Sequence, residues 1–357
     1  MLVVLGLILF VLLVVVHEYG HLIAAKRSGV EVEEFGIGFP PRAKVITKKN
    51  GTVYTLNWLP IGGFVKLKGE HDSASEKGSF GAAKFVSKFK IIAAGVVMNW
   101  LTAIVIFTAL AVVGMPQLVE NQFNIASDAT VSSQEVLAGF VQGGSPADKA
   151  GLEQGNTIVS IDGVAITSSE VLQNTTKKNA GKSVDIAYLD GDETVTKTSQ
   201  LRKDSDQGNL GVSPADRTTV RSTWSAPIVG VGTTAQFTYE TFKGLFGAIG
   251  NVLTGNGSEA SQSVTGPVGI VVILNDLASQ GFVFVLFLIG VISVSLAVMN
   301  TLPIPALDGG RLFVMSIYKL LKKPLSKETE EKIHGTGMLV LLALALLITV
   351  VDIRRFF

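Results

Sequence analysis

The run LVVLGLILFVLLVVVHEYGHLIAA, residues 2–25, is uncharged from Leu2 to Val16 and then carries His17, Glu18 and His21. A helix of this length is long enough to cross the ~30 Å hydrocarbon core of a bilayer. Ionisable side chains inside such a helix are costly in lipid and by default mark function. No charged segment precedes the run and no cleavage signal ends it, so we expect a retained membrane span that carries a functional site.

The five residues HEYGH form an H-E-x-x-H motif at positions 17–21. Residues four apart share one face of a helix, so His17 and His21 point the same way. Two imidazoles at this spacing can bind one zinc ion, and the glutamate between them is placed as a general base. The alternative is a chance pair of polar residues at a helix end. That alternative is weak here, because three polar side chains in lipid need partners.

The composition favours a membrane protein. Of 357 residues, 47% are hydrophobic and 17% are charged, against about 25% charged in ordinary soluble domains. The net charge of +1 gives no sign of a nucleic-acid partner. The chain has no cysteine and four histidines, so a metal site must use His, Asp or Glu.

Apolar runs, strand-like stretches and polar loops divide the chain into successive segments. We expect a polytopic α-helical membrane protein with about four transmembrane helices, a membrane-associated β-hairpin region and one small α+β domain. The third apolar run contains prolines, which break a helix. The expected segments are a span at 1–25, a β region and connector at 26–90, a span at 91–115, a soluble domain at 121–216, an interfacial helix and loop at 226–278, a broken span at 281–318, a connector at 319–335 and a span at 336–353.

Charge near the membrane predicts the orientation. The loops at 26–90 and 319–335 are rich in Lys and Arg, so the positive-inside rule places them in the cytoplasm. The active site is then on the cytoplasmic side. The soluble domain and both termini are extracytoplasmic.

The third metal ligand has to come from outside the motif. Arg27 stands where longer zincin motifs have a third histidine, and a glutamate of the strand-like segment (Glu31, Glu33 or Glu34) is conceivable. Asp308, in NTLPIPALDGGR, is the other carboxylate set within an apolar run. It also fits an N-cap that restarts the helix after the prolines. A metal site made of two His from one helix and one Asp from another would explain why both apolar runs contain ionisable residues.

HEYGH and the sequence N-x-x-P-x-P-x-L-D-G-G (residues 300–310) resemble the site-2 proteases, which are intramembrane zinc metalloproteases. The chain is most similar to the bacterial regulator-of-sigma-E protease type. The likeness extends to EFGIGF (34–39), GGFVKL (62–67), Gly95 with Asn99, and Gly266-Pro267. One departure is Val96, where many relatives have proline.

The resemblance implies one catalytic zinc ion held by His17, His21 and Asp308, with Glu18 as catalytic base. Zinc chemistry agrees, because the metal activates water and polarises a carbonyl while a carboxylate transfers the proton.

The resemblance also implies substrate-binding residues. Asn300 would help to hold the substrate backbone, although hydrogen bonding between helices explains it equally well. The β-hairpin near Gly36 and Gly38 would pair with an unwound substrate by β-augmentation. His71 and His334 are expected to be ordinary side chains, because neither pairs with another residue at ligand spacing.

The sequence GSPADKAGLEQGNTIVSIDG, residues 144–163, resembles a PDZ domain of bacterial proteases. Such a domain could bind a peptide at a strand edge, or act as a steric filter against bulky substrate domains. The sequence leaves both open.

The predicted function is an intramembrane zinc endopeptidase in a bacterial cell membrane. It would cleave single-pass membrane proteins such as anti-sigma factors, with signal-peptide remnants as a second substrate class. One rival is a non-enzymatic adaptor that displays the PDZ domain. Another is a metalloprotease for prenylated substrates, which needs neither the PDZ domain nor the LDGG element.

Overall fold

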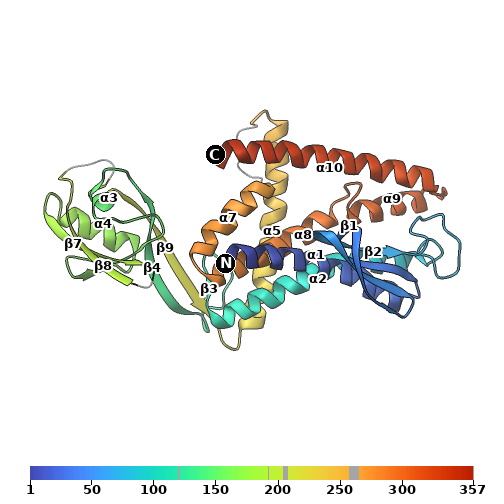
Figure 1. Cartoon of the computed structure of the whole chain (residues 1–357), viewed down its shortest axis with the longest axis horizontal. Helices are drawn as coiled ribbons and strands as arrows, with labels where there is room; N and C mark the ends of the chain where they lie inside the picture. Colours follow the sequence, from blue (N-terminus) through green and yellow to red (C-terminus); the bar gives the residue numbers. More distant parts are fainter. Residues whose placement is uncertain (120, 192, 204–207, 257–264, 357) are drawn as a thin grey trace. The chain divides into compact units, whose positions relative to one another are not determined.

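The computed structural model describes residues 1–119, 121–191, 193–203, 208–256 and 265–356 (Figure 1). Its contacts divide the chain into two units. Unit 1 comprises Met1–Thr108 and Gly230–Phe357, and unit 2 comprises Ala109–Val229. The polar loop expected within 226–278 lies largely at 257–264, outside the described residues.

Four helices of the described chain have the length and apolar character of membrane spans, as predicted: α1 (Leu2–Arg27), α2 (Phe85–Val113), α8 (Phe282–Thr301) and α10 (Lys327–Phe356). Helix α2 begins before the expected residue 91, because Lys88 is buried and paired with Asp72 rather than exposed in a connector. Helix α10 begins before residue 336, because its charged first turns are helical as well.

The third apolar run is broken as predicted. Helix α8 ends at Thr301, and α9 (Asp308–Leu320) starts after the Pro303–Pro305 turn. A Cβ on Gly309 would lie 2.4 Å from the Thr301 carbonyl oxygen, and one on Gly310 would lie 1.9 Å from that of Ile304. The two glycines therefore let α9 start directly against the backbone of the turn.

The β region is a small sheet made from two long strands, β1 (Val32–Lys49) and β2 (Thr52–Leu67). Residues 34–37 of β1 pair with residues 53–56 of β2 on one side and 63–66 on the other. The inner face of the sheet packs Phe35 and Leu67 into a cluster with Leu22 of α1. Large apolar side chains at its far end, including Trp58 at 71% exposure, support the expected association with the membrane.

Two further helices complete unit 1. Helix α5 (Ala226–Leu253) packs through Phe237 on Phe107 of α2 and Phe287 of α8. It runs across the direction of α2 and α10 in Figure 1. Helix α7 (Pro267–Ser279) is joined to α10 at its N-terminus, where the Gly269 amide donates to the buried Asp352 carboxylate over 2.8 Å.

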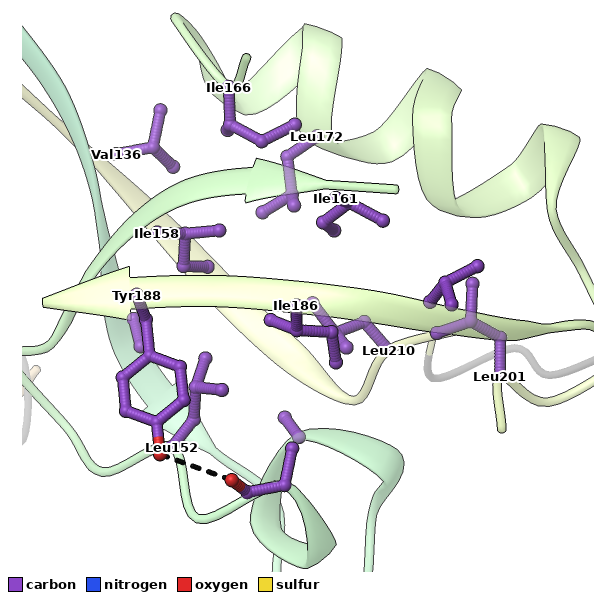
Figure 2. Close-up of a cluster of buried hydrophobic side chains, with 14 residues drawn as sticks. Val136, Leu152, Ile158, Ile161, Ile166, Leu172, Ile186, Tyr188, Leu201 and Leu210 are labelled. Atoms are coloured by element: carbon purple, nitrogen blue, oxygen red, sulfur yellow. Dashed lines mark hydrogen bonds between the residues drawn. The ribbon is translucent and has the colours of Figure 1, made fainter. Parts of the chain in front are cut away.

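Unit 2 is an antiparallel sheet with two helices. Its strands are ordered β3-β9-β4-β5-β7-β8, with β6 on β5. Figure 2 shows Ile158 and Ile161 of β5 gathered with Ile186 of β7 and Leu172 of α4. The elements are β3 (Met115–Pro116), β4 (Thr130–Val141), α3 (Pro146–Lys149), β5 (Thr157–Ile161), β6 (Val164–Ala165), α4 (Ser169–Lys178), β7 (Ser183–Asp190), β8 (Glu193–Gln200) and β9 (Val212–Arg221).

We predict that Ile158→Ala destabilises unit 2 by about 2–5 kcal/mol, because Ile158 is 1% exposed and its loss leaves a cavity. Val159→Ala on the same strand is the control, since Val159 is exposed and its loss should cost under about 0.5 kcal/mol. Hydrogen exchange of the β7 amides in the full-length protein in detergent measures both. Equal effects of the two substitutions would contradict this core.

Candidate active site

Three donor atoms from two helices meet in unit 1. His17 Nε2 lies 3.0 Å from Asp308 Oδ2, and His21 Nε2 lies 3.2 Å from the same oxygen. The two Nε2 atoms are 3.2 Å apart. Both histidines are 7% exposed. The structure thus brings together the two motif histidines and the carboxylate that follows the helix break.

The far side of each imidazole sets its tautomer. His21 Nδ1–H donates to the Ile91 carbonyl over 2.7 Å. His17 Nδ1 lies 3.2 Å from the side-chain amide of Asn99. With the amide nitrogen toward the ring, the buried Asn99 Oδ1 has no partner. Exchanging the two amide atoms places Oδ1 against His17 Nδ1, and we assign the amide that way because an imidazole that binds a metal through Nε2 carries its proton on Nδ1. Each Nε2 then carries a lone pair.

The cluster formed by His17, His21 and Asp308 therefore has three acceptors that converge with no donor between them. With both imidazoles neutral, such an arrangement is stabilised by a metal cation. A tetrahedral zinc ion about 2.0–2.1 Å from each ligand places neighbouring ligand atoms about 3.3 Å apart. The observed separations of 3.0–3.2 Å match that spacing within a few tenths of an ångström. It is the one grouping of three or more metal-ligating side chains in the described residues.

Gly95 of α2 keeps the space beside the imidazoles open. A Cβ there would lie 2.6 Å from His21 Nε2 and 2.7 Å from His17 Nε2, closer than real side chains approach. Helix α1 approaches α2 through its own glycine, since a Cβ on Gly20 would lie 2.5 Å from the Ala94 carbonyl oxygen. Gly95 thus leaves room for the imidazoles, and Asn99 orients the ring of His17.

Glu18 lies between the cluster and the sheet. Its carboxylate faces the Val65 amide of β2 and interacts with the charges of His17, His21 and Asp308. A Cβ built on Gly63 would lie 3.6 Å from its Cγ. The part of β2 that contains Gly63 and Val65 therefore borders the predicted base directly.

Asp308 is the first residue of α9, and the N-cap is Leu307, which makes no side-chain cap bond. The Asp308 carboxylate turns to the histidines instead, so the N-cap interpretation is wrong. His334 contacts the turn that precedes Asp308. The Ala306 N–H, in a turn whose residue 306 has φ of 79°, donates to His334 Nδ1 over 3.1 Å. His334 on α10 thus holds the turn that delivers Asp308.

The remaining predicted site residues lie elsewhere. Asn300 Nδ2 donates to the Leu296 carbonyl of its own helix over 3.1 Å. Gly36 sits between two segments of β2, and Gly38 has φ of 79° with the Leu59 carbonyl 2.5 Å from a built Cβ. The candidate glutamate ligands are in ion pairs instead, Glu31 with Lys68, Glu33 with Lys66 and Glu34 with Arg42.

Sequence reasoning gave Asn99 and His334 no role in the site. A lone amide in the second apolar run, four residues after a glycine, was a usable signal for Asn99. For His334 the sequence carries no local signal, because its partner is a backbone amide 28 residues away.

Known proteins resemble this chain over nearly its whole length. The family model described as Peptidase family M50 matches residues 5–344. A protein of Clostridium perfringens named as a zinc metalloprotease is 32% identical over 356 residues, which cover 99% of this chain and 98% of that protein. The regulator of sigma-W protease RasP of Bacillus subtilis is 28% identical over 435 aligned residues, covering 98% of each.

Among solved structures, the PDZ domain of an SdrC-like protein of Listeria monocytogenes is 26% identical and covers 24% of this chain and 90% of that one. Its TM-score of 0.21 is too low to show a shared fold. The PDZ-like character of unit 2 therefore rests on its own strands and helices.

We predict that Asp308→Ala lowers the zinc content of the purified protein well below one ion per chain, because two imidazoles alone bind the metal weakly. Glu18→Gln keeps full zinc, because its side chain is no ligand. Metal analysis after dialysis against a weak chelator measures both. Full zinc in Asp308→Ala would rule out Asp308 as a ligand.

We predict that Asn99→Leu lowers zinc affinity about 10–100-fold, the usual effect of losing the partner that orients a metal-binding histidine. Asn99→Asp has nearly the same shape and keeps an acceptor for His17 Nδ1–H, so it should retain the metal. Competition with a chromogenic chelator compares the two variants. The assigned role fails if both variants bind zinc alike.

Proposed function

This chain belongs to peptidase family M50 and is an intramembrane zinc metalloprotease; we propose that it cleaves single-pass membrane proteins within or beside their transmembrane segment. The observation that carries the proposal is the cluster of His17, His21 and Asp308 on helices of a membrane bundle. Peptide hydrolysis inside a membrane bundle needs a metal, a base and a way to present an extended substrate.

One zinc ion would be held by His17 Nε2, His21 Nε2 and a carboxylate oxygen of Asp308. Three protein ligands leave the fourth position of a catalytic site open. When bound, zinc supplies a Lewis acid that activates water and polarises the scissile carbonyl. Asn99 and the Ile91 carbonyl keep both imidazoles in the tautomer that this role requires.

Glu18 acts as the base. Its carboxylate interacts with the charges of His17, His21 and Asp308, so it lies beside the ligands. Glu18 takes a proton from the attacking water and passes it to the leaving amine. The neighbouring Val65 amide holds the carboxylate on the side of the sheet.

The substrate is presented as a strand. A transmembrane helix hides its carbonyls in its own hydrogen bonds, so it has to unwind before cleavage. The segment Gly63–Leu67 of β2 pairs only with β1 among the described strands and borders Glu18. An unwound substrate added to that edge has its carbonyls beside the base. Gly36 and Gly38 would then support the sheet from within, and Asn300 would contact substrate only after a local rearrangement.

The protein crosses the membrane several times, and the basic loops orient it. Residues 26–90 and 319–335 face the cytoplasm, and so does the metal cluster, which lies near the C-terminal end of α1. Unit 2 and both termini lie on the outer side.

The substrate class follows from this placement. A site near the cytoplasmic end of the spans would release a cytoplasmic segment from a membrane-held protein already trimmed outside. Anti-sigma factors have this form, and the printed name of the RasP relative, regulator of sigma-W protease, supports that use. Signal-peptide remnants are a second class.

Unit 2 has a groove that favours peptide binding over a purely steric role. A cavity of about 1110 Å³ lies between α4 and the start of β9, lined by Lys177, Lys203 and Val212 among others. Residues 212–216 of β9 pair with β4 on one side, and among the described strands only β3 pairs on the other side, at residues 219–220. An extended peptide with a terminal carboxylate fits that free edge and the two lysines.

The rival functions explain less. An adaptor has no use for three converging acceptors beside a glutamate. A protease for prenylated substrates has no use for the groove of unit 2.

We predict that Glu18→Gln abolishes cleavage, with a rate loss of at least about 10²-fold, because an amide cannot accept the proton. The assay uses the full-length protein in detergent and a single-pass peptide whose outer domain has been removed, with products identified by mass spectrometry. Glu33→Gln is the matched control, because Glu33 is exposed and paired with Lys66. Cleavage by Glu18→Gln within twofold of the unmodified protein would refute the assigned base.

A further inference from the structure

A groove runs along the outside of the bundle between α1 and α2. Its volume is about 590 Å³, and its walls are mostly small or apolar, with Gly20 and Ala24 from α1 and Ala93 and Val97 from α2. Val97 is 45% exposed. Because both helices are membrane spans, the open side of this α1–α2 groove faces the hydrocarbon of the bilayer.

Two cations stand at one end of the groove. Arg27 is the last residue of α1, and Lys90 lies in the second turn of α2, so both mark the end where the two spans leave the membrane. No acidic residue of the described chain lines the groove. Within the part of the chain that the structure describes, neither cation forms an ion pair, whereas nearby Lys88 pairs with Asp72.

Because Arg27 and Lys90 lie at one end of an apolar groove and are unpaired among the described residues, the charge of a ligand decides how well it binds there. A neutral substrate helix would fill the walls but leave the cations without a counterion, and a zwitterionic lipid brings a phosphate that its own ammonium group already balances. An anionic phospholipid supplies both parts, a phosphate for the guanidinium and ammonium groups and an acyl chain for the walls. We propose that the α1–α2 groove binds one anionic phospholipid, with its headgroup phosphate on Arg27 and Lys90 and an acyl chain along Gly20 and Ala93.

The site would matter to the metal cluster through packing. Gly20 lies on α1 between the two histidines and contacts the Ala94 carbonyl of α2. The next residue of α2, Gly95, has its backbone against the imidazoles. A lipid chain seated on this contact fixes the spacing of α1 and α2 from the outside. The proposal does not depend on the protease activity.

Native mass spectrometry of the full-length protein, titrated with phosphatidylglycerol or phosphatidylcholine in detergent, tests the site. We expect one phosphatidylglycerol to bind more tightly than phosphatidylcholine. Arg27→Gln with Lys90→Gln should lower phosphatidylglycerol affinity roughly 30-fold and leave phosphatidylcholine unchanged, since each surface cation contributes about a fivefold effect. The matched control is Lys48→Gln with Lys49→Gln, which removes two exposed cations from the β1–β2 turn and should change nothing.

Two further variants keep the test decisive. Arg27→Lys with Lys90→Arg retains both charges and should retain the lipid, while Ala93→Phe fills the groove and should expel it with the charges intact. An unchanged far-ultraviolet circular dichroism spectrum reports that each variant is folded. Equal binding of the two lipids, or equal loss in the control pair, would overturn the proposal. So would displacement of the lipid by a neutral transmembrane peptide at stoichiometric concentration, which would mark the groove as a seat for substrate.

Discussion

The structure depends on holding three hydrogen-bond acceptors about 3 Å apart inside a bundle of candidate membrane spans, with both histidines buried. Unpaired, such groups would oppose folding, because burying polar atoms without partners costs several kcal/mol each. A cation turns the same arrangement into a link between α1 and α9. Nearly every unusual feature of unit 1 either brings these atoms together or keeps their far sides satisfied.

The backbone meets this constraint through breaks and small residues. The Pro303–Pro305 turn stops α8 and lets α9 begin with Asp308 beside the histidines, and the two following glycines allow the close packing. Gly20 and Gly95 bring α1 and α2 within backbone distance. The far sides are satisfied by the Ile91 carbonyl and by Asn99. The last span contributes His334, which holds the turn before Asp308.

The sequence alone indicated much of this, and the reasons for success and failure are physical. Spans, the broken helix and the strand-like stretches follow from local periodicity and proline chemistry, so they were predictable. Asp308 was predictable as a partner of HEYGH because a carboxylate in an apolar run is as costly as a histidine. The starts of α2 and α10 were missed, because Lys88 and the charged first turns of α10 belong to helices that tertiary contacts stabilise. The roles of Asn99 and His334 depend on pairings across 82 and 28 residues, which no local pattern encodes.

The central claim is that His17, His21 and Asp308 together hold one zinc ion. X-ray absorption spectroscopy at the zinc edge, on the purified full-length protein loaded with one equivalent of metal, tests it most directly. The account predicts four light-atom ligands at about 2.0–2.1 Å, of which two are imidazoles. Only His71 and His334 could supply further imidazoles. A spectrum with three imidazoles, or one that is unchanged in Asp308→Ala, would contradict the account.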